Sequence, residues 1–344
     1  MVDTAVSSSA AWRRAAALAF TLVLAALIAS AGLASAAAVK VGLLREGTLT
    51  APIYIAKERR YFAQQGIDCE IVAFDAAQPV AVAVVSGDLD VAVNGLTAGF
   101  YKLASQGALR IIAGYGREAP TFRAQAAVAS KVAYAAGLTS PAGLGGHSVA
   151  ISQIGGASHY ILGLLADKYG FELGSVQIMP VQSNPNAATA VTGGRADAAV
   201  VPGRYVLPAI GRGDVKLLAW IGDETPWQLG AVITSAKKLR SDPELIAHFL
   251  SAYREGVRDY HDAFTGPGEK RQDGPMAPEI IKIISKYTGT PPETIRDSIG
   301  YIDRDAALDI ADIARQIAWY KAQNLLSGNL TAEELIVPSV TPAH

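Results

Sequence analysis

The chain has 344 residues, of which 50% are hydrophobic and 18% are charged, and this length and apolar content predict about two domains with sizeable cores. Its 30 basic and 31 acidic residues give a formal net charge of −1, which argues against the broadly basic surface used to bind nucleic acid. Cys69 is the only cysteine of the chain, so an intramolecular disulfide and a cysteine-based metal site are both excluded.

The first 36 residues differ in character from the rest of the sequence. Two arginines precede an almost unbroken apolar run from Ala15 to Ala29, and Ala34-Ser35-Ala36 offers the small-x-small pattern at which signal peptidase cuts. We therefore predict a cleavable signal peptide over residues 1–36 and a periplasmic location. The alternative is an uncleaved membrane anchor, because the weakly polar run continues to about Ala38. The paired arginines leave open both the general and the twin-arginine export routes.

Short β-like runs alternate with helical stretches through residues 39–220. The predicted strands are 39–44, 68–74, 90–93, 110–115, 147–151, 176–181, 197–201 and 215–220. The predicted helices between them are 52–58, 79–86, 158–169 and 185–192. Such alternation predicts βαβ units in mostly parallel sheets flanked by helices, an α/β fold. A glycine–aspartate turn before a buried strand occurs in residues 86–92 and again in 192–199, which predicts two similar lobes.

From Asp242 onward the pattern becomes helical. Apolar residues recur at helical spacing, with proline at or near the helix starts, over residues 243–262, 278–288, 292–301 and 305–326. Residues 266–275 form a polar loop rich in glycine and proline. These features predict a helical C-terminal region.

Four segments together resemble one known family. Pro52-Ile53-Tyr54-Ile55-Ala56-Lys57-Glu58, which runs into Tyr61-Phe62 and Gln65-Gly66-Ile67-Asp68, is similar to an early helix of binding proteins for nitrate, sulfonates, taurine and the pyrimidine precursor of thiamine. The segments SGDLDVA (86–92), AGLGGHSVA (142–150) and GGRADAA (193–199) match further family patterns in the same order. Arg60 and Ala142 depart from the glycine and aspartate that are usual in the family.

The resemblance implies a type II periplasmic binding protein, in which two α/β lobes hold a ligand in the cleft between them. Lobe 1 would comprise residues 39–127 and 230–344, and lobe 2 residues 128–229. The implied function is the solute-binding component of an ABC importer: a monomer without cofactor, metal or catalytic activity, whose partners are a small ligand and an inner-membrane permease. Independently of the resemblance, ligands bind beyond the carboxyl ends of parallel strands.

The loops after the predicted strands are therefore the candidate binding site. The residues selected from them, together with one aromatic residue for the wall of the cleft, are Arg45, Glu46, Thr48, Asn94, Gly95, Thr97, Tyr115, Gly155, Gly156, Ala157, Ser158, His159, Arg204, Tyr205 and Trp227.

The segment Gly155-Gly156-Ala157-Ser158-His159 carries the sharpest prediction. It follows a strand and opens a helix, where unpaired N–H groups and the helix dipole favour an anion. Arg45 and Arg204 could grip a carboxylate or sulfonate with two parallel hydrogen bonds. Glu46 could instead cancel Arg45 or receive an amine. These residues favour a small anionic metabolite as the ligand.

Three alternatives remain open at the level of sequence. A neutral pyrimidine could bind the same scaffold through aromatic stacking and Glu46. An enzyme could share the fold, although the histidines show no metal-ligand spacing and neither a nucleophile elbow nor a phosphate-binding loop occurs. A sensor that signals to a membrane partner would share every feature described so far.

Overall fold

The computed structural model describes residues 36–45 and 47–337. The predicted signal peptide, except Ala36, lies outside the described residues, and so does Glu46.

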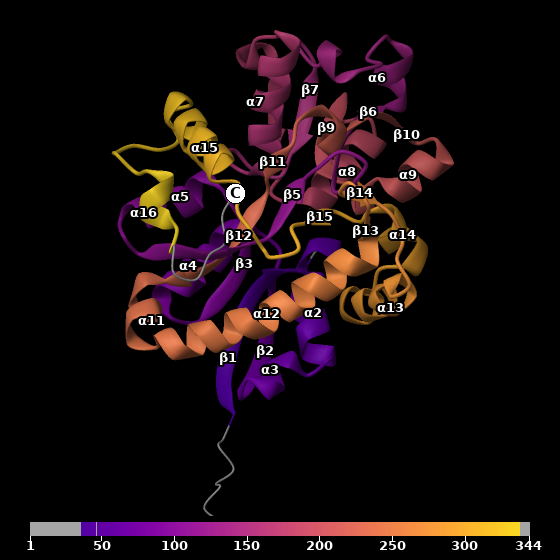
Figure 1. Cartoon of the computed structure of the whole chain (residues 1–344). Helices are drawn as coiled ribbons and strands as arrows, with labels where there is room; N and C mark the ends of the chain where they lie inside the picture. Colours follow the sequence, from indigo (N-terminus) through magenta and orange to yellow (C-terminus); the bar gives the residue numbers. More distant parts are fainter. Residues whose placement is uncertain (1–35, 46, 338–344) are drawn as a thin grey trace, which may run out of the picture. The chain divides into compact units, whose positions relative to one another are not determined.

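The first sheet has five strands in the order β2-β1-β3-β12-β4 (Figure 1). Its strands are β1 (Ala37–Leu44), β2 (Ile67–Phe74), β3 (Val91–Gly95), β4 (Leu109–Gly114) and β12 (Gly230–Ser235). β1 pairs parallel with β3, while β12 runs antiparallel to both β3 and β4. The helices between these strands are α2 (Ala51–Glu58), α3 (Tyr61–Gln64), α4 (Ala77–Ser86) and α5 (Ala98–Ser105).

The second sheet repeats this plan in the order β10-β6-β9-β7-β8. Its strands are β6 (Gln125–Ser130), β7 (Ser148–Ile151), β8 (Gln177–Pro180), β9 (Ala198–Pro202) and β10 (Val215–Trp220). β7 pairs parallel with β8 and β9, and β6 runs antiparallel to β9 and β10. The associated helices are α6 (Lys131–Ala135), α7 (Ala157–Tyr169), α8 (Asn184–Thr192), α9 (Leu207–Arg212) and α10 (Ile221–Glu224). In each sheet one strand, β12 or β6, therefore runs antiparallel to both of its neighbours.

The repeated glycine–aspartate turn has the same role in both sheets. Asp90 accepts a hydrogen bond from the Lys40 N–H of β1 at 2.9 Å, and Asp197 accepts one from the Ser148 N–H of β7 at 2.9 Å. Each carboxylate thus ties the start of one strand to a neighbouring strand. The sequence repeat corresponds to a repeated structural element.

Two chain crossings connect the sheets. β5 (Gly116–Glu118) leads from the first sheet into β6, and β11 (Trp227–Gln228) leads from the second sheet into β12. β5 pairs antiparallel with β11 and with β15 (Tyr301–Ile302) in a three-stranded sheet. The opposed strand of each main sheet is therefore the one that enters from the other sheet.

The C-terminal region is helical but differs from the sequence prediction in two places. Its helices are α11 (Ala236–Ser241), α12 (Pro243–Phe264), α13 (Ala277–Thr288), α14 (Pro292–Asp297), α15 (Ile310–Ala322) and α16 (Ala332–Leu335). The helix predicted to reach residue 301 ends at Asp297, because Tyr301 pairs with β5 instead. The helix predicted from residue 305 begins at Ile310, where the Asp309 side chain caps it by accepting from the Asp312 N–H. The predicted loop contains the small hairpin of β13 (Thr265–Gly266) and β14 (Lys270–Arg271).

Helix α15 packs behind the chain crossings. Asp312 accepts a hydrogen bond from the Gln228 N–H of β11 at 2.6 Å, and the Gln316 amide donates to the Gln228 carbonyl at 2.6 Å. Trp319 packs edge-to-face on Tyr160 of α7, with ring centroids 5.3 Å apart. α15 therefore braces both a crossing and the helix that follows β7.

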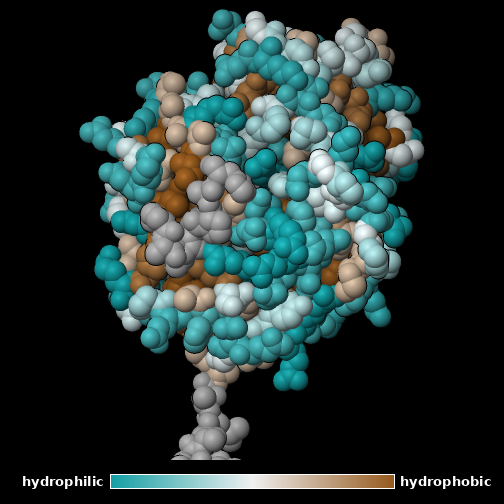
Figure 2. All heavy atoms as spheres, in the orientation of Figure 1, coloured by the Kyte–Doolittle hydropathy of each residue, from teal (hydrophilic) through white to brown (hydrophobic). Residues whose placement is uncertain are grey.

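Figure 2 shows the molecular surface in the orientation of Figure 1: hydrophilic residues cover most of this face, and hydrophobic residues form smaller patches. The large hydrophobic side chains that are exposed on the described residues are Val82, Val85, Val132, Ile154 and Met276. Within residues 36–45 and 47–337, no helix combines the length and the apolar character needed to cross a bilayer.

Candidate functional site

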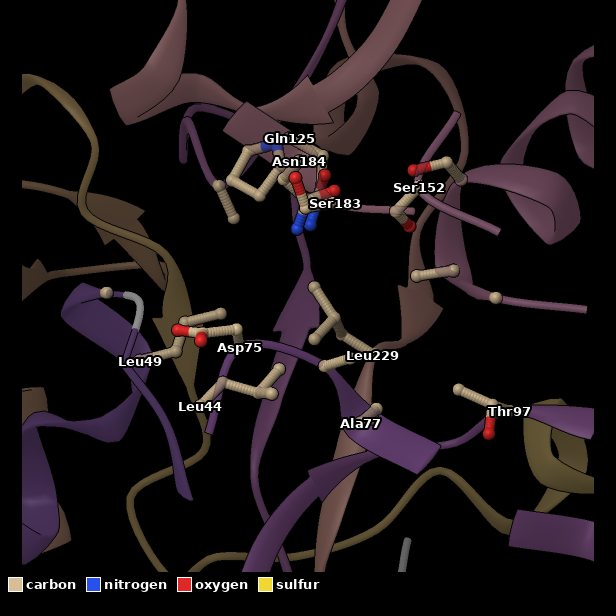
Figure 3. Close-up of a pocket in the computed structure, with 18 of the residues that line it drawn as sticks. Leu44, Leu49, Asp75, Ala77, Thr97, Gln125, Ser152, Ser183, Asn184 and Leu229 are labelled. Carbon is tan, nitrogen blue, oxygen red and sulfur yellow. The ribbon is translucent and has the colours of Figure 1, made fainter. Parts of the chain in front are cut away.

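A pocket lies where strand ends of both main sheets face each other (Figure 3). It encloses about 1040 Å³ of empty space, counting its open mouth. The first sheet contributes residues at the ends of β1 and β3, and the second contributes residues that follow β7, β8 and β9. This is the carboxyl edge of the parallel strands, where α/β sheets bind ligands.

The turn before α7 supplies part of the pocket wall. Gly156, Ala157 and Ser158 line the pocket, and Ser158 is buried. Gly155 has a φ of +74°, a left-handed conformation that favours glycine. The first N–H groups of a helix have no partner within the helix, so this turn presents donors and the positive end of the α7 dipole to the pocket.

His159 supports this turn from outside the pocket lining. Its Nδ1 accepts a hydrogen bond from the Gly155 N–H at 3.1 Å, and its ring packs edge-to-face on Trp319 with centroids 5.1 Å apart. Burial lowers the pKa of His159, which favours the neutral ring that can accept this bond. His159 thus shapes the turn, and the neighbouring backbone lines the pocket.

Arg204 brings a positive charge to the second-sheet side. Its guanidinium stacks on the Tyr205 ring, 4.4 Å from the centroid, and Nη2 donates to the Tyr205 hydroxyl at 2.5 Å. Nη1 lies 3.5 Å from the Thr290 hydroxyl oxygen. The Nε atom is buried and makes no hydrogen bond with any described residue. Tyr205 therefore orients a cation that retains an unused donor.

Arg45 lies at the rim, outside the pocket lining. Its Nε forms an ion pair with Asp75 at 3.0 Å, and the two side chains are 64% and 81% exposed. Asp75 does line the pocket. The acid that neutralises Arg45 in the structure is thus Asp75, from the loop after β2.

Four of the predicted first-sheet residues line the pocket: Thr48, Gly95, Thr97 and Tyr115. Two of the hydroxyls already serve the fold, since Thr48 donates to the Ser298 carbonyl at 2.9 Å and Thr97 caps α5.

Asn94 and Trp227 lie outside the lining. Asn94 is buried on β3 between the lining residues Val93 and Gly95. Because successive side chains of a strand point to opposite faces, its side chain points away from the pocket. Trp227 is 2% exposed and packs on Tyr160 with centroids 5.3 Å apart.

Several lining residues were absent from the sequence prediction. They include Leu44, Leu49, Asp75, Gln125, Ser152, Gln153, Ser183, Asn184 and Leu229. Asp75 and the pair Ser183-Asn184 follow predicted strands, so the rule that selected the other loops would have found them. Gln125 opens β6, whose alanine-rich sequence gave no strand signal.

The two sheets also touch beside the pocket. The Ala98 N–H of α5 donates to the Gly155 carbonyl at 2.9 Å. A β-carbon at Gly155 would lie 2.8 Å from the Ala98 β-carbon, closer than such atoms approach. Glycine at this position therefore permits the contact between the two halves.

The described residues hold no cluster of three or more histidine, cysteine, aspartate or glutamate side chains arranged for a metal ion.

Two α/β lobes joined by two crossings, with a pocket between them, define the two-lobed fold of periplasmic binding proteins. The structure is similar to the periplasmic aliphatic sulphonate binding protein SsuA from Escherichia coli, with a TM-score of 0.69 and 17% identity over 88% of this chain and 98% of that one. It is also similar to the alkanesulfonate-binding protein SsuA from Xanthomonas axonopodis pv. citri bound to MOPS, with a TM-score of 0.65 and 19% identity over 90% of this chain and 99% of that one. The periplasmic nitrate-binding protein NrtA from Synechocystis PCC 6803 is also similar, with a TM-score of 0.65 and 16% identity over 88% of this chain and 86% of that one.

The NMT1/THI5 like family model matches residues 48–267, and the chain belongs to this family. No curated protein matches the chain. The fold and the family expected from the sequence are thus confirmed.

Proposed function

We propose that this protein is the solute-binding component of an ABC importer and that it captures a small organic anion between its lobes by hinge closure. The observation that carries the proposal is the pocket itself, which is lined by strand ends of both sheets and by the first turn of α7. A ligand that touches both lobes stabilises the closed form, and a permease can recognise that form.

Two features support an anionic ligand. The start of α7 directs N–H donors and a positive dipole end at the pocket. Arg204 keeps its buried Nε without a partner among the described residues, so a ligand oxygen could accept from it. Asp75, the one acid among the described residues that line the pocket, is paired with Arg45.

The remaining parts of the proposal follow the family and the sequence. Lobe 1 comprises residues 39–127 and 230–344 and lobe 2 residues 128–229, so that the first boundary falls within β6 and the second immediately before β12. The protein acts as a monomer in the periplasm after removal of residues 1–36, and it delivers its ligand to an inner-membrane permease. It has no catalytic role of its own.

A neutral pyrimidine is the second candidate ligand. The side-chain amides of Gln125 and Asn184 line the pocket and could pair with the ring nitrogens and carbonyls of a heterocycle. Tyr115 supplies an aromatic face.

A thermal-shift screen of the purified protein tests both candidates. Sulfonates, taurine, nitrate, carboxylates and pyrimidines would each be added at increasing concentration. A ligand at about a hundred times its Kd adds about 2.7 kcal/mol of stability, which raises the Tm by several degrees. A shift with one anionic class supports the main proposal, whereas a shift with pyrimidines alone supports the second. A flat profile across the panel would contradict both.

A matched pair of serine variants locates the binding. Ser158→Ala removes a buried hydroxyl at the start of α7, and we expect it to weaken binding of the anion found in the screen by about 1–3 kcal/mol. Ser105→Ala removes an exposed hydroxyl at the end of α5 and should leave the Kd unchanged. Isothermal titration calorimetry measures both, and equal Kd values in the two variants would count against this location.

A further inference from the structure

The two walls of the pocket differ in chemistry. The wall on the side of the first sheet is apolar where three leucines, Leu44, Leu49 and Leu229, meet the cavity (Figure 3). They come from the end of β1, from the short helix after it and from the residue before β12. Leu49 and Leu229 are buried, and Leu44 is half-buried. Three segments far apart in the sequence thus form one hydrophobic surface.

The opposite wall, on the side of the second sheet, is polar. Gln125, Ser152, Ser183 and Asn184 lie across the cavity from the leucines in Figure 3. Ser183 already caps α8, since its hydroxyl accepts from the Asn186 N–H at 3.3 Å. The other groups on this wall are amides and hydroxyls, which both donate and accept hydrogen bonds.

Gln125 carries an unpaired polar atom on this wall. Its side chain is 7% exposed and lines the pocket, and its Oε1 atom is buried without a hydrogen-bond partner among the described residues. Leaving a buried polar atom unpaired costs about 1–3 kcal/mol, so native proteins satisfy nearly all such groups. A bound molecule with a hydrogen-bonding group beside Gln125 would remove this cost.

Taking the proposed binding function as given, we propose that the ligand is amphipathic: a hydrogen-bonding acid group meets the polar wall and an apolar body of several carbons lies on the leucine wall. A small ion such as nitrate satisfies only the polar side and leaves the leucines facing water. Taurine would place a charged amine on the leucine side, where the carboxylate of Asp75 is already paired with Arg45. The pocket therefore selects organic acids that carry an alkyl or aryl body.

The test is a chain-length series measured by isothermal titration calorimetry on the purified protein. The probes are nitrate, taurine, and the linear alkanesulfonates and alkanoates with one to eight carbons. Burial of one methylene contributes about 0.8 kcal/mol, so we expect affinity to rise about fourfold for each carbon that reaches the leucine wall. Nitrate, taurine and methanesulfonate should bind most weakly.

Two variants test whether the leucines cause this gain. Leu44→Ser alters the half-buried member of the apolar wall, and it should reduce the gain per carbon while affecting the shortest probe little. Val132→Ser changes a valine that is 76% exposed on α6, outside the pocket lining, and should leave the whole series unchanged.

The outcomes separate this proposal from the function on which it rests. Equal affinity at all chain lengths, or tightest binding of nitrate or taurine, would overturn the amphipathic ligand and leave a binding protein for small ions. A gain per carbon that persists in folded Leu44→Ser would overturn the role of the leucine wall. No binding of any probe would reject the anion-binding function as well. Should Leu44→Ser fail to fold, the series on the unaltered protein still decides between a rising and a flat dependence.

Discussion

The two sides of the chain crossings treat buried polar groups differently. On the α15 side, Asp312 and Gln316 form hydrogen bonds with both the N–H and the carbonyl of Gln228. On the pocket side, Gln125 Oε1 and Arg204 Nε are buried without partners among the described residues. Asp312 and Gln316 thus fix β11 to α15 with satisfied hydrogen bonds, whereas Gln125 and Arg204, which line the pocket, each keep one polar atom for which the described residues supply no partner.

The first prediction concerns the hydrogen bond between Asp312 of α15 and Gln228 of β11. Asp312→Ala removes a carboxylate that is 3% exposed, and it leaves the buried Gln228 N–H without its acceptor. Arg315 is half-exposed, so the main cost is the buried hydrogen bond to a charged group that is lost at Gln228. Such a bond contributes about 1.5–3 kcal/mol, and we expect a loss of about that size in the free energy of unfolding. Urea denaturation measures the loss. The control Asp167→Ala changes an exposed carboxylate on α7, the helix that packs against α15. It should cost less than about 0.5 kcal/mol. Equal losses would contradict the bracing role of α15.

The second prediction compares the two arginines of the candidate site. Arg204→Ala should weaken ligand binding by about 1–3 kcal/mol, because it removes a cation that lines the pocket and whose Nε has no partner among the described residues. Arg45→Ala removes an exposed ion pair at the rim and should change binding by less than about 1 kcal/mol. Titration of an anion identified in the thermal-shift screen gives both values. A larger effect at Arg45 would place the anion at the mouth of the pocket.

The third prediction concerns a carboxyl group within the crossings themselves. Burial raises the pKa of Glu118 well above its ordinary value of 4.5, and the nearby Asp223 carboxylate raises it further. The folded state therefore holds a proton that the unfolded state releases. As the pH rises above about 4.5, this group lowers the free energy of unfolding by up to about 1.4 kcal/mol per pH unit, until the raised pKa is passed.

Glu118→Gln tests this sign. The uncharged amide keeps the size of the side chain and does not titrate, so the stability of the variant should fall less with pH than that of the unaltered protein. The matched control Glu172→Gln changes an exposed residue and should keep the original slope. Denaturation curves at pH 4 to 8 measure the difference, and parallel profiles for Glu118→Gln and the unaltered protein would show that Glu118 is ionised in the fold.

The fourth and smallest prediction addresses lobe contact beside the pocket. Gly155→Ala places a β-carbon 2.8 Å from that of Ala98 and forces alanine into a φ of +74°. Gly170→Ala imposes the same φ of +74° at the end of α7 with no atom within 4 Å. The backbone strain should cost each variant about 1 kcal/mol of stability, and Gly155→Ala should lose more because of its clash with Ala98. Only Gly155→Ala should also weaken ligand binding, because the added β-carbon pushes α5 away from the turn that lines the pocket. Equal affinities in the two variants would argue against closure at this contact.

The sequence located eight of the 25 residues that line the pocket, because one rule, strand followed by loop, was applied to it. That rule found Thr48, Thr97, Ser158 and Arg204. Applied after every predicted strand, it would also have found Asp75 and Asn184. It could not have found Gln125, because β6 is an alanine-rich strand whose partners β9 and β10 lie some seventy or more residues later in the chain.

What the sequence determined by itself was local: the alternation of strands and helices, the glycine–aspartate device of each sheet, and the turn that opens α7. Backbone propensity, capping and hydrophobic periodicity act over a few neighbouring residues, so a single sequence displays them directly. Only the tertiary structure decided which strand runs against the others, that Asp75 pairs with Arg45, and that His159 supports the turn from behind. It also placed the leucine wall of the pocket opposite the polar wall. Each of these depends on contacts between segments that meet only when the two lobes fold and pack, and local propensity carries no record of such contacts.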